Sequence, residues 1–176
     1  MIVLATNPPR RQWCQDSCYE DPAAQRIMDR MSNITGVAET NAEHLQLLRY
    51  EVGQVRVHSF KSHALRNLAC RQLIVRAQLT FRYSFPSQYY HPHNDYIEYQ
   101  LDRPVGVRIL TFFLYLNDVE EGGETRFPRI GLQVKPATGR AVLWPSIFDD
   151  DPNMNDIRSD HEARPVIKGV KYGCVY

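Results

Sequence analysis

Residues 89–97 have the sequence YYHPHNDYI, in which a single residue separates His93 from Asp95. Alternate residues of a β-strand point to one face, so one extended segment can direct both side chains at one metal ion. His161, from a neighbouring strand, would complete two imidazoles and one carboxylate on one side of that ion. This set leaves other positions open, which suits non-haem Fe(II). His91 is the nearest alternative ligand, but the need for a hard carboxylate beside two imidazoles favours Asp95.

The His-x-Asp pattern is weak alone, but several short motifs surround it in a fixed order. They are LRYEVGQ (48–54), RILT (108–111), YLN (115–117), EGGETRFP (121–128), VKP (134–136), GRA (139–141) and PVIKGVKY (165–172). Together with the His-x-Asp stretch and His161, these motifs resemble the prolyl 4-hydroxylase family of 2-oxoglutarate- and Fe(II)-dependent dioxygenases. The resemblance covers roughly residues 25 to 173.

The resemblance implies which residues bind iron and the cosubstrate. His93, Asp95 and His161 match the iron ligands of the family. Lys171 matches the basic residue that pairs with the distal carboxylate of 2-oxoglutarate, and a dicarboxylate in a partly closed barrel needs a cation at its far end. The alternative for Lys171 is a solvent-facing lysine on an edge strand. Ordinary buried or surface roles are expected for the other histidines, His44, His58 and His63.

Three further side chains take their expected roles from the same resemblance. Tyr50 and Thr111 resemble the hydroxyl donors that share the distal carboxylate with the lysine. Thr111 has an alternative as an ordinary strand residue, because threonine favours β-strands. Tyr90 resembles an aromatic residue on the substrate side of the iron, with plain packing as its alternative.

The implied reaction is the oxidative decarboxylation of 2-oxoglutarate to succinate and carbon dioxide, coupled to hydroxylation of a C–H bond. Molecular oxygen is the second substrate, ascorbate the expected reductant, and no side-chain nucleophile or acid–base pair is required. A peptide or protein containing proline is the expected substrate, and the endoplasmic reticulum the implied compartment. The alternatives are hydroxylation of another residue or a free amino acid, or a catalytically impaired metal-binding module.

Length and composition limit the other possibilities. The 176 residues, 43% hydrophobic, are most simply one globular catalytic domain spanning residues 1–176. A formal net charge of +1 gives no reason to expect nucleic acid as a partner. No apolar run is long enough to span a membrane, and residues 1–6 are too short for a signal peptide.

The pattern of segments predicts an α+β protein with a double-stranded β-helix (jelly-roll) core preceded by helices. A helix is predicted at residues 23–33 and a short helix or turn at 41–46, whereas the first twenty residues are expected to be irregular. The predicted strands are residues 47–50, 89–99, 107–116, 131–134, 141–144, 163–167 and 170–176. Gly122-Gly123 is predicted to form a turn between strands.

Residues 55–88 interrupt the family pattern. This segment contains six Arg/Lys, no Asp or Glu and no Gly, and its removal joins Gly53-Gln54 directly to Tyr89-Tyr90. Its first and last residues are compatible with the codon letters at intron ends, so we interpret it as a retained intron or gene-model error. The alternative is a real basic insertion that binds an acidic partner. Tyr83, inside it, imitates Tyr50 but lacks the following Gly-Gln.

The two ends and the cysteines complete the expectations. The chain stops five residues after Lys171, before the family's last strand is complete, and the amino-terminal strand and helix that usually precede this region are expected to be absent. An incomplete barrel strand would expose unpaired backbone groups. Cys14 and Cys18 are close enough to form a disulfide, which fits a secretory compartment, but two free thiols remain an alternative.

Overall fold

The structure is a computed structural model that describes residues 10–52, 90–102 and 104–176. The segment 55–88, with the predictions made for His58, His63 and Tyr83, lies outside the described residues. No helix in the described ranges has the length and apolar character needed to cross a membrane.

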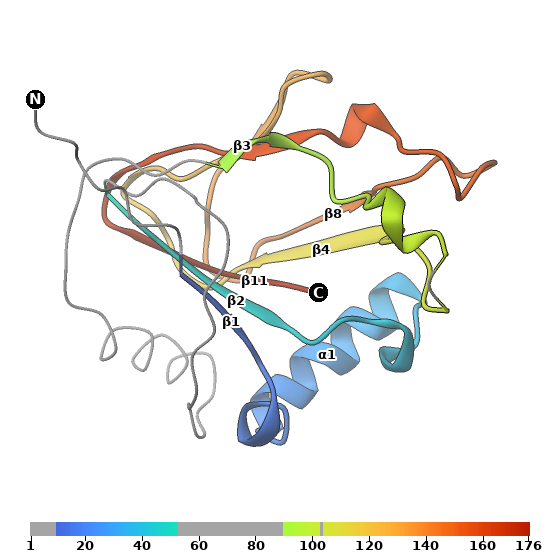
Figure 1. The fold of residues 1–176 in the computed structure, drawn as a ribbon. Coiled ribbons are helices and arrows are strands. Elements are labelled where there is room, and N and C mark those ends of the chain that lie inside the picture. Colours follow the sequence, from blue (N-terminus) through green and yellow to red (C-terminus); the bar gives the residue numbers. More distant parts are fainter. Residues whose placement is uncertain (1–9, 53–89, 103) are drawn as a thin grey trace, which may run out of the picture.

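A five-stranded antiparallel sheet forms the centre of the molecule (Figure 1). Its strands, in spatial order, are β1 (Arg10–Trp13), β2 (Gln46–Glu51), β11 (Val170–Val175), β4 (Leu110–Tyr115) and β8 (Ala141–Pro145). The order places the carboxy-terminal strand β11 between β2 and β4, so the sheet is completed by segments far apart in the sequence.

A second sheet of four strands faces the first. It contains β3 (Tyr90–His93), β9 (His161–Ala163), β6 (Thr125–Phe127) and β7 (Leu132–Val134). β5 (Glu121–Gly122) and β10 (Val166–Lys168) form a separate two-stranded sheet. In the chain, β5 leads into β6 and β10 follows β9. In Figure 1, β3 lies above β4 and β11 of the larger sheet. Two facing sheets with these connections confirm the predicted jelly-roll type of core.

The outer face of the five-stranded sheet is covered by α1 (Pro22–Thr35), which lies beneath the sheet in Figure 1. Asp21 caps this helix by accepting a hydrogen bond from the backbone of Ala23, and Gly36 ends it in the left-handed conformation. Met28 and Met31 are buried against the sheet residues Phe112, Leu116, Tyr172 and Cys174.

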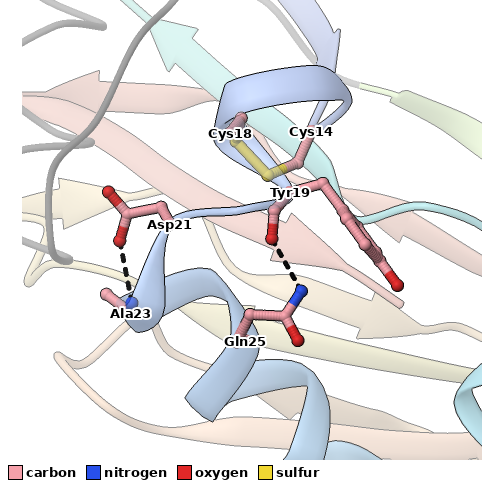
Figure 2. Close-up of a disulfide and its surroundings, with 6 residues drawn as sticks. All are labelled: Cys14, Cys18, Tyr19, Asp21, Ala23 and Gln25. Atoms are coloured by element: carbon pink, nitrogen blue, oxygen red, sulfur yellow. Dashed lines mark hydrogen bonds between the residues drawn. A yellow bond between two sulfur atoms is a disulfide. The ribbon is translucent and has the colours of Figure 1, made fainter.

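A disulfide joins Cys14 to Cys18 where β1 leads into the helical segment (Figure 2). The 3-10 helix η1 (Asp16–Cys18) forms the turn that brings the two cysteines together. Both side chains are buried in the cluster under α1, and the carbonyl of Tyr19 accepts a hydrogen bond from Gln25 of the helix. Of the two alternatives left open by the sequence, the structure forms the disulfide.

The inner face of the five-stranded sheet packs against the smaller sheet. Leu48 and Tyr50 of β2 lie there with Trp144 of β8, as members of one buried cluster. Gly173 is required at the centre of this face, because an added Cβ would lie only 2.5 Å from Cζ of Phe113. The space that this glycine leaves is filled by the aromatic ring from β4.

Several sequence-based boundaries were wrong. The expected irregular start contains β1, which an alternation pattern could not reveal because four residues are too few. The short helix or turn predicted at 41–46 lies earlier, as the 3-10 helix η2 (Glu39–Asn41), and the chain then leads into β2 as expected. Among the described residues α1 is the one α-helix, and the remaining helical turns are η3 (Glu98–Gln100) and η4 (Ile157–Ser159).

Candidate metal and cosubstrate site

His93, Asp95 and His161 come together as predicted, with one ligand atom of each within 4.8 Å of the others. Oδ1 of Asp95 lies 3.6 Å from Nε2 of His93, and Oδ2 lies 3.7 Å from Nε2 of His161. The two histidines face each other in register across β3 and β9, and their ring centroids are 4.3 Å apart. Two imidazole nitrogens and a carboxylate on one side suit a divalent ion that keeps open positions.

Asp95 reaches this cluster from a loop, which differs from the predicted strand over residues 89–99. β3 ends at His93, because the Asn94 side chain accepts a hydrogen bond from the backbone of Tyr96 and bends the chain. The amide nitrogen of Asn94 donates to the backbone of Asp156 and to the hydroxyl of Ser159, both at 3.0 Å. The residue between the two ligands therefore ties their loop to the segment that precedes His161.

Thr111 holds the carboxylate of Asp95. Its hydroxyl donates a hydrogen bond of 2.7 Å to Oδ2. Burial alone would raise the pKa of Asp95, but the interaction with His93, the neighbouring imidazoles and the Thr111 hydroxyl hold that pKa well below its usual range. A carboxylate kept ionised in this way is ready to bind a cation.

The imidazole of His161 is fixed on both sides. Nδ1 lies 3.0 Å from the carbonyl oxygen of Ser159, which accepts from the ring in the tautomer that leaves Nε2 free for a metal. The ring packs against Trp144 and Phe127, with centroids 4.6 Å and 5.7 Å away. Burial lowers the pKa of His161 despite the opposing charge of Asp95, which favours the neutral form that binds metals.

Lys171 is a buried lysine whose ammonium nitrogen has no hydrogen-bond partner among the described residues. Its Nζ lies 5.0 Å from the ring centroid of Tyr50, 4.9 Å from that of Phe113 and 5.3 Å from that of Tyr115. Burial lowers its pKa to about 7, against the charge of Glu124. A desolvated ammonium in an aromatic cage is suited to an anionic ligand.

Tyr50 and Lys171, both expected to bind the distal carboxylate of 2-oxoglutarate, lie opposite each other on β2 and β11, and their binding of the cosubstrate stays a prediction. Thr111 is placed differently. It lies two residues before Phe113 and four before Tyr115 on β4, and both of those rings border the Lys171 ammonium. Its hydroxyl donates its hydrogen bond to Asp95.

A hydroxyl that the sequence analysis missed is hydrogen-bonded to one of the tyrosines around the lysine. Thr125 is buried on β6 and accepts a 2.6 Å hydrogen bond from the hydroxyl of Tyr115, whose ring borders the Lys171 ammonium. Gly123, two residues earlier, is also adjacent, since a Cβ there would be 3.5 Å from Cδ of Lys171. The EGGET motif could have suggested this threonine, but its glycines were interpreted only as a turn.

The other assignments have less structural context. Tyr90 begins β3 opposite Ala163, and its role on the substrate side stays a prediction. His44 makes an edge-on contact with Tyr19 at 5.7 Å, in keeping with the ordinary role expected for it. Gly122 ends β5 and Gly123 follows it on the way to β6, and both adopt positive φ, in keeping with the predicted turn.

Comparison with known families gives this arrangement its context. The profile of the 2OG-Fe(II) oxygenase superfamily matches residues 79–176, more than half of the chain. The chain belongs to this superfamily. The match includes all three metal-binding candidates and Lys171, and it begins inside the 55–88 segment.

Curated relatives identify the branch of the superfamily that the chain resembles. It is 28% identical over 175 residues to the chicken prolyl 4-hydroxylase subunit alpha-2, covering 98% of this chain and 26% of the relative. It is 31% identical over 163 residues to the rat prolyl 4-hydroxylase subunit alpha-1, covering 89% of this chain and 23% of the relative. The chain thus spans about a quarter of their length. The predicted resemblance to prolyl 4-hydroxylases is confirmed.

A solved structure shows the same fold. The crystal structure of a viral collagen prolyl hydroxylase from Paramecium Bursaria Chlorella virus-1, in its 2OG complex, superposes with a TM-score of 0.63 at 20% identity. The superposition covers 96% of this chain and 77% of the viral one. At this identity the similarity concerns the fold alone.

Proposed function

We propose that the chain is a 2-oxoglutarate- and Fe(II)-dependent dioxygenase that hydroxylates proline residues in peptides or proteins. The main support is the pairing of two features in one core: the His93, Asp95 and His161 cluster, and the unpaired buried ammonium of Lys171. The relatives named prolyl 4-hydroxylase support proline as the target. An iron site alone would not require the buried cation.

The residues present fit both groups. His93, Asp95 and His161 would hold Fe(II), and Lys171 would pair with the distal carboxylate of 2-oxoglutarate, which gives its ammonium the missing partner. Tyr50 borders the same ammonium. We propose that the second hydroxyl at this end belongs to Thr125 rather than to Thr111 as the sequence predicted.

Each protein group then has a defined task. Thr111 keeps Asp95 oriented, and the Ser159 carbonyl keeps the His161 ring in the metal-binding tautomer. The aromatic residues Phe113, Tyr115 and Trp144 exclude water from the pocket. With iron, 2-oxoglutarate and oxygen bound, the cofactor chemistry supplies the oxidation of a C–H bond while 2-oxoglutarate is converted to succinate and carbon dioxide.

Charged side chains on the β1 side of the metal cluster are candidates for contact with the substrate. Arg11 lies on β1 opposite Leu48, an inner-face residue, and its charge interacts with those of Asp95 and Arg108. Arg108 forms a two-pronged ion pair with Glu43 at 2.6 Å and 2.8 Å. Polar groups of this kind can fix the backbone of an extended peptide, for which proline-rich chains are already preorganised.

Two further features of the proposal come from the family resemblance. Ascorbate would serve as the reductant, and an oxidising compartment such as the endoplasmic reticulum would be compatible with the Cys14–Cys18 disulfide. Omission of ascorbate should slow repeated turnover, and secretion-pathway fractionation of the tagged natural protein tests the compartment.

Mass spectrometry of a proline-rich peptide tests the central part of the proposal. Incubation with the protein, Fe(II), 2-oxoglutarate and oxygen should add one oxygen atom to a proline, and Lys171→Met should abolish this. Thr138→Val, an exposed change, serves as the matched control and should have no effect. Oxygen added to another residue would favour a different hydroxylase. Metal binding without 2-oxoglutarate turnover would instead identify an impaired metal-binding module.

A further inference from the structure

Trp144 is a buried aromatic residue with a hydrogen-bond donor that the metal ligands do not use. Its side chain is 6% exposed, and its indole Nε1 has no hydrogen-bond partner among the described residues. Buried donors in proteins are almost always paired, and tryptophan usually satisfies its N–H when buried. A phenylalanine would provide a packing surface for its neighbours without leaving a polar group unpaired. The indole nitrogen therefore calls for an acceptor.

The position of Trp144 places that acceptor at the metal end of the pocket. Its ring lies against the ring of His161, with centroids 4.6 Å apart. Across the sheet it is in register with Thr111, the residue that holds Asp95. Trp144 thus packs against one metal-binding candidate, His161, and pairs across the sheet with Thr111, the hydrogen-bond donor to another, Asp95. Thr111 lies two residues before Phe113, a ring of the cage around Lys171, so the indole lies next to this cage on the side of the metal ligands.

The neighbouring protein groups do not provide the acceptor. Phe127, the other ring beside Trp144, has no polar atom, and no acceptor among the described residues lies within hydrogen-bonding geometry of the indole nitrogen. A ligand that brings its own anionic oxygens to the metal end would satisfy the indole. 2-Oxoglutarate carries such oxygens in the carboxylate next to its keto group, and its other carboxylate is the one assigned to Lys171.

We infer that Trp144 binds the cosubstrate, by donating its indole N–H to a carboxylate oxygen at the keto-acid end of 2-oxoglutarate. This inference rests on the proposed function. It gives the pocket a donor at each end, with the ammonium of Lys171 at the distal carboxylate and the indole at the proximal one. A dicarboxylate without the keto group should pair with the ammonium of Lys171 but should not accept a hydrogen bond from the indole of Trp144.

The indole signals in a nitrogen–proton NMR spectrum test this directly. The chain has two tryptophans, so two indole signals are expected, and Trp13→Phe assigns them. With redox-inert Zn(II) in place of iron, 2-oxoglutarate should move the Trp144 signal downfield and leave that of Trp13 in place. Glutarate, which lacks the keto group, should not. A Trp144 signal that 2-oxoglutarate leaves in place in the Zn(II)-loaded protein, or that glutarate moves equally, would overturn the inference.

Binding measurements on variants separate a donor from a packing residue. Trp144→Phe should weaken 2-oxoglutarate binding about tenfold, the effect of losing one hydrogen bond to a charged group, with Zn(II) affinity nearly unchanged. Replacement of Trp144 by benzothienylalanine, its sulfur isostere without an N–H, should do the same with the packing preserved.

Two other outcomes are decisive. Unchanged 2-oxoglutarate binding in both variants, or parallel losses of Zn(II) and cosubstrate affinity, would overturn the role of Trp144 while wild-type binding leaves the proposed function intact. Failure of the Zn(II)-loaded wild-type protein to bind 2-oxoglutarate would overturn the proposed function together with this inference.

Discussion

At the scale of single residues, the site separates side chains that would bind ligands from those that orient them. His93, Asp95 and His161 present the ligand atoms, whereas Thr111 and the carbonyl of Ser159 fix two of them through hydrogen bonds of 2.7 Å and 3.0 Å. Such supporting partners commonly change metal affinity by about 10–100-fold when removed. The orienting residues can therefore be tested without deleting a ligand.

Thr111→Val should lower the affinity for Zn(II) or Fe(II) about tenfold, because Asp95 loses its hydroxyl donor and part of its orientation. Calorimetric titration of the metal measures the effect. Thr138→Val provides an exposed control. If the buried change left metal affinity equal to that of the control, the orienting role of Thr111 would be wrong.

Lys171 predicts a pH dependence of cosubstrate binding. Burial lowers its pKa from 10.5 to about 7, while pairing with a carboxylate requires the charged form. Above about pH 7, binding must therefore take up a proton, and the affinity for 2-oxoglutarate should fall, up to about tenfold per pH unit. The other titratable groups around the ammonium are Glu124, whose charge opposes the shift, and Tyr50 and Tyr115.

Calorimetry in two buffers of different ionisation enthalpy measures this proton directly. Stability of the ligand-free protein has the opposite trend, because the unfolded chain holds the Lys171 proton up to about pH 10 and the folded one does not. Stability should thus increase as the pH rises from about 7 towards 10. No proton uptake at pH 8.5, or the same uptake in Lys171→Met, would contradict the assignment.

At the scale of elements, β11 contributes both to the centre of the larger sheet and to the site. It pairs with β2 on one side and β4 on the other, and it presents Lys171 to the inner face. The approach of Phe113 to Gly173 fixes how these strands pack, because an added methyl group has no room. The packing of β11 against β4 and the position of Lys171 therefore both depend on the approach of Phe113 to Gly173.

Gly173→Ala should destabilise the protein by about 1–3 kcal/mol, the usual cost of an overpacked core, and lower its melting temperature. Phe113→Leu in the same chain should recover part of the loss, because the new methyl group then meets a smaller side chain. A double-mutant cycle by thermal or urea unfolding gives the coupling. Additive effects of the two changes would show that the close approach is not the cause.

The disulfide is a second element-scale feature. It closes a short turn between β1 and α1, and both of its cysteines belong to the buried cluster under the helix (Figure 2). Cys14→Ser with Cys18→Ser should lower the free energy of unfolding by roughly 2 kcal/mol, from the entropy of a short closed loop. Unfolding with and without reductant measures this. A wild-type protein unaffected by reductant would indicate that the bond does not form.

At the scale of the whole molecule, the sequence predicted most of what depends on motif order. His93, Asp95, His161 and Lys171 were found because their neighbours recur at fixed spacing, and the fold brings the first three together and buries Lys171. The sequence could not show which hydroxyl points to which partner. Thr111 was assigned to the cosubstrate, yet its position on β4 puts it beside Asp95.

Other features escaped for physical reasons. β1 is four residues long and is stabilised by backbone pairing with β2, so its side chains carry no clear alternation. The loop position of Asp95 depends on the hydrogen bond that the Asn94 side chain accepts from the backbone of Tyr96, which no periodicity records. The sequence did not point to Trp144, because its proposed role rests on an indole nitrogen without a hydrogen-bond partner among the described residues, which no sequence motif records.

The interpretation of residues 55–88 as a retained intron is a prediction about the whole molecule. If the segment is a retained intron, transcripts should mostly lack its thirty-four codons (88 − 54), and a protein without residues 55–88 should bind Zn(II) and 2-oxoglutarate at least as well. Sequencing of cDNA across residues 50–95 tests the first point. A predominant transcript that contains these codons would refute the intron hypothesis and favour a real basic insertion.

The stoichiometry of the coupled reaction tests the proposed chemistry most directly. Proton NMR of the protein with Fe(II), 2-oxoglutarate, oxygen and a proline-rich peptide should show succinate and hydroxyproline formed in equal amounts, both lost in Asp95→Ala. A protein that binds Fe(II) through this cluster but forms no succinate, with or without peptide, would contradict the assignment.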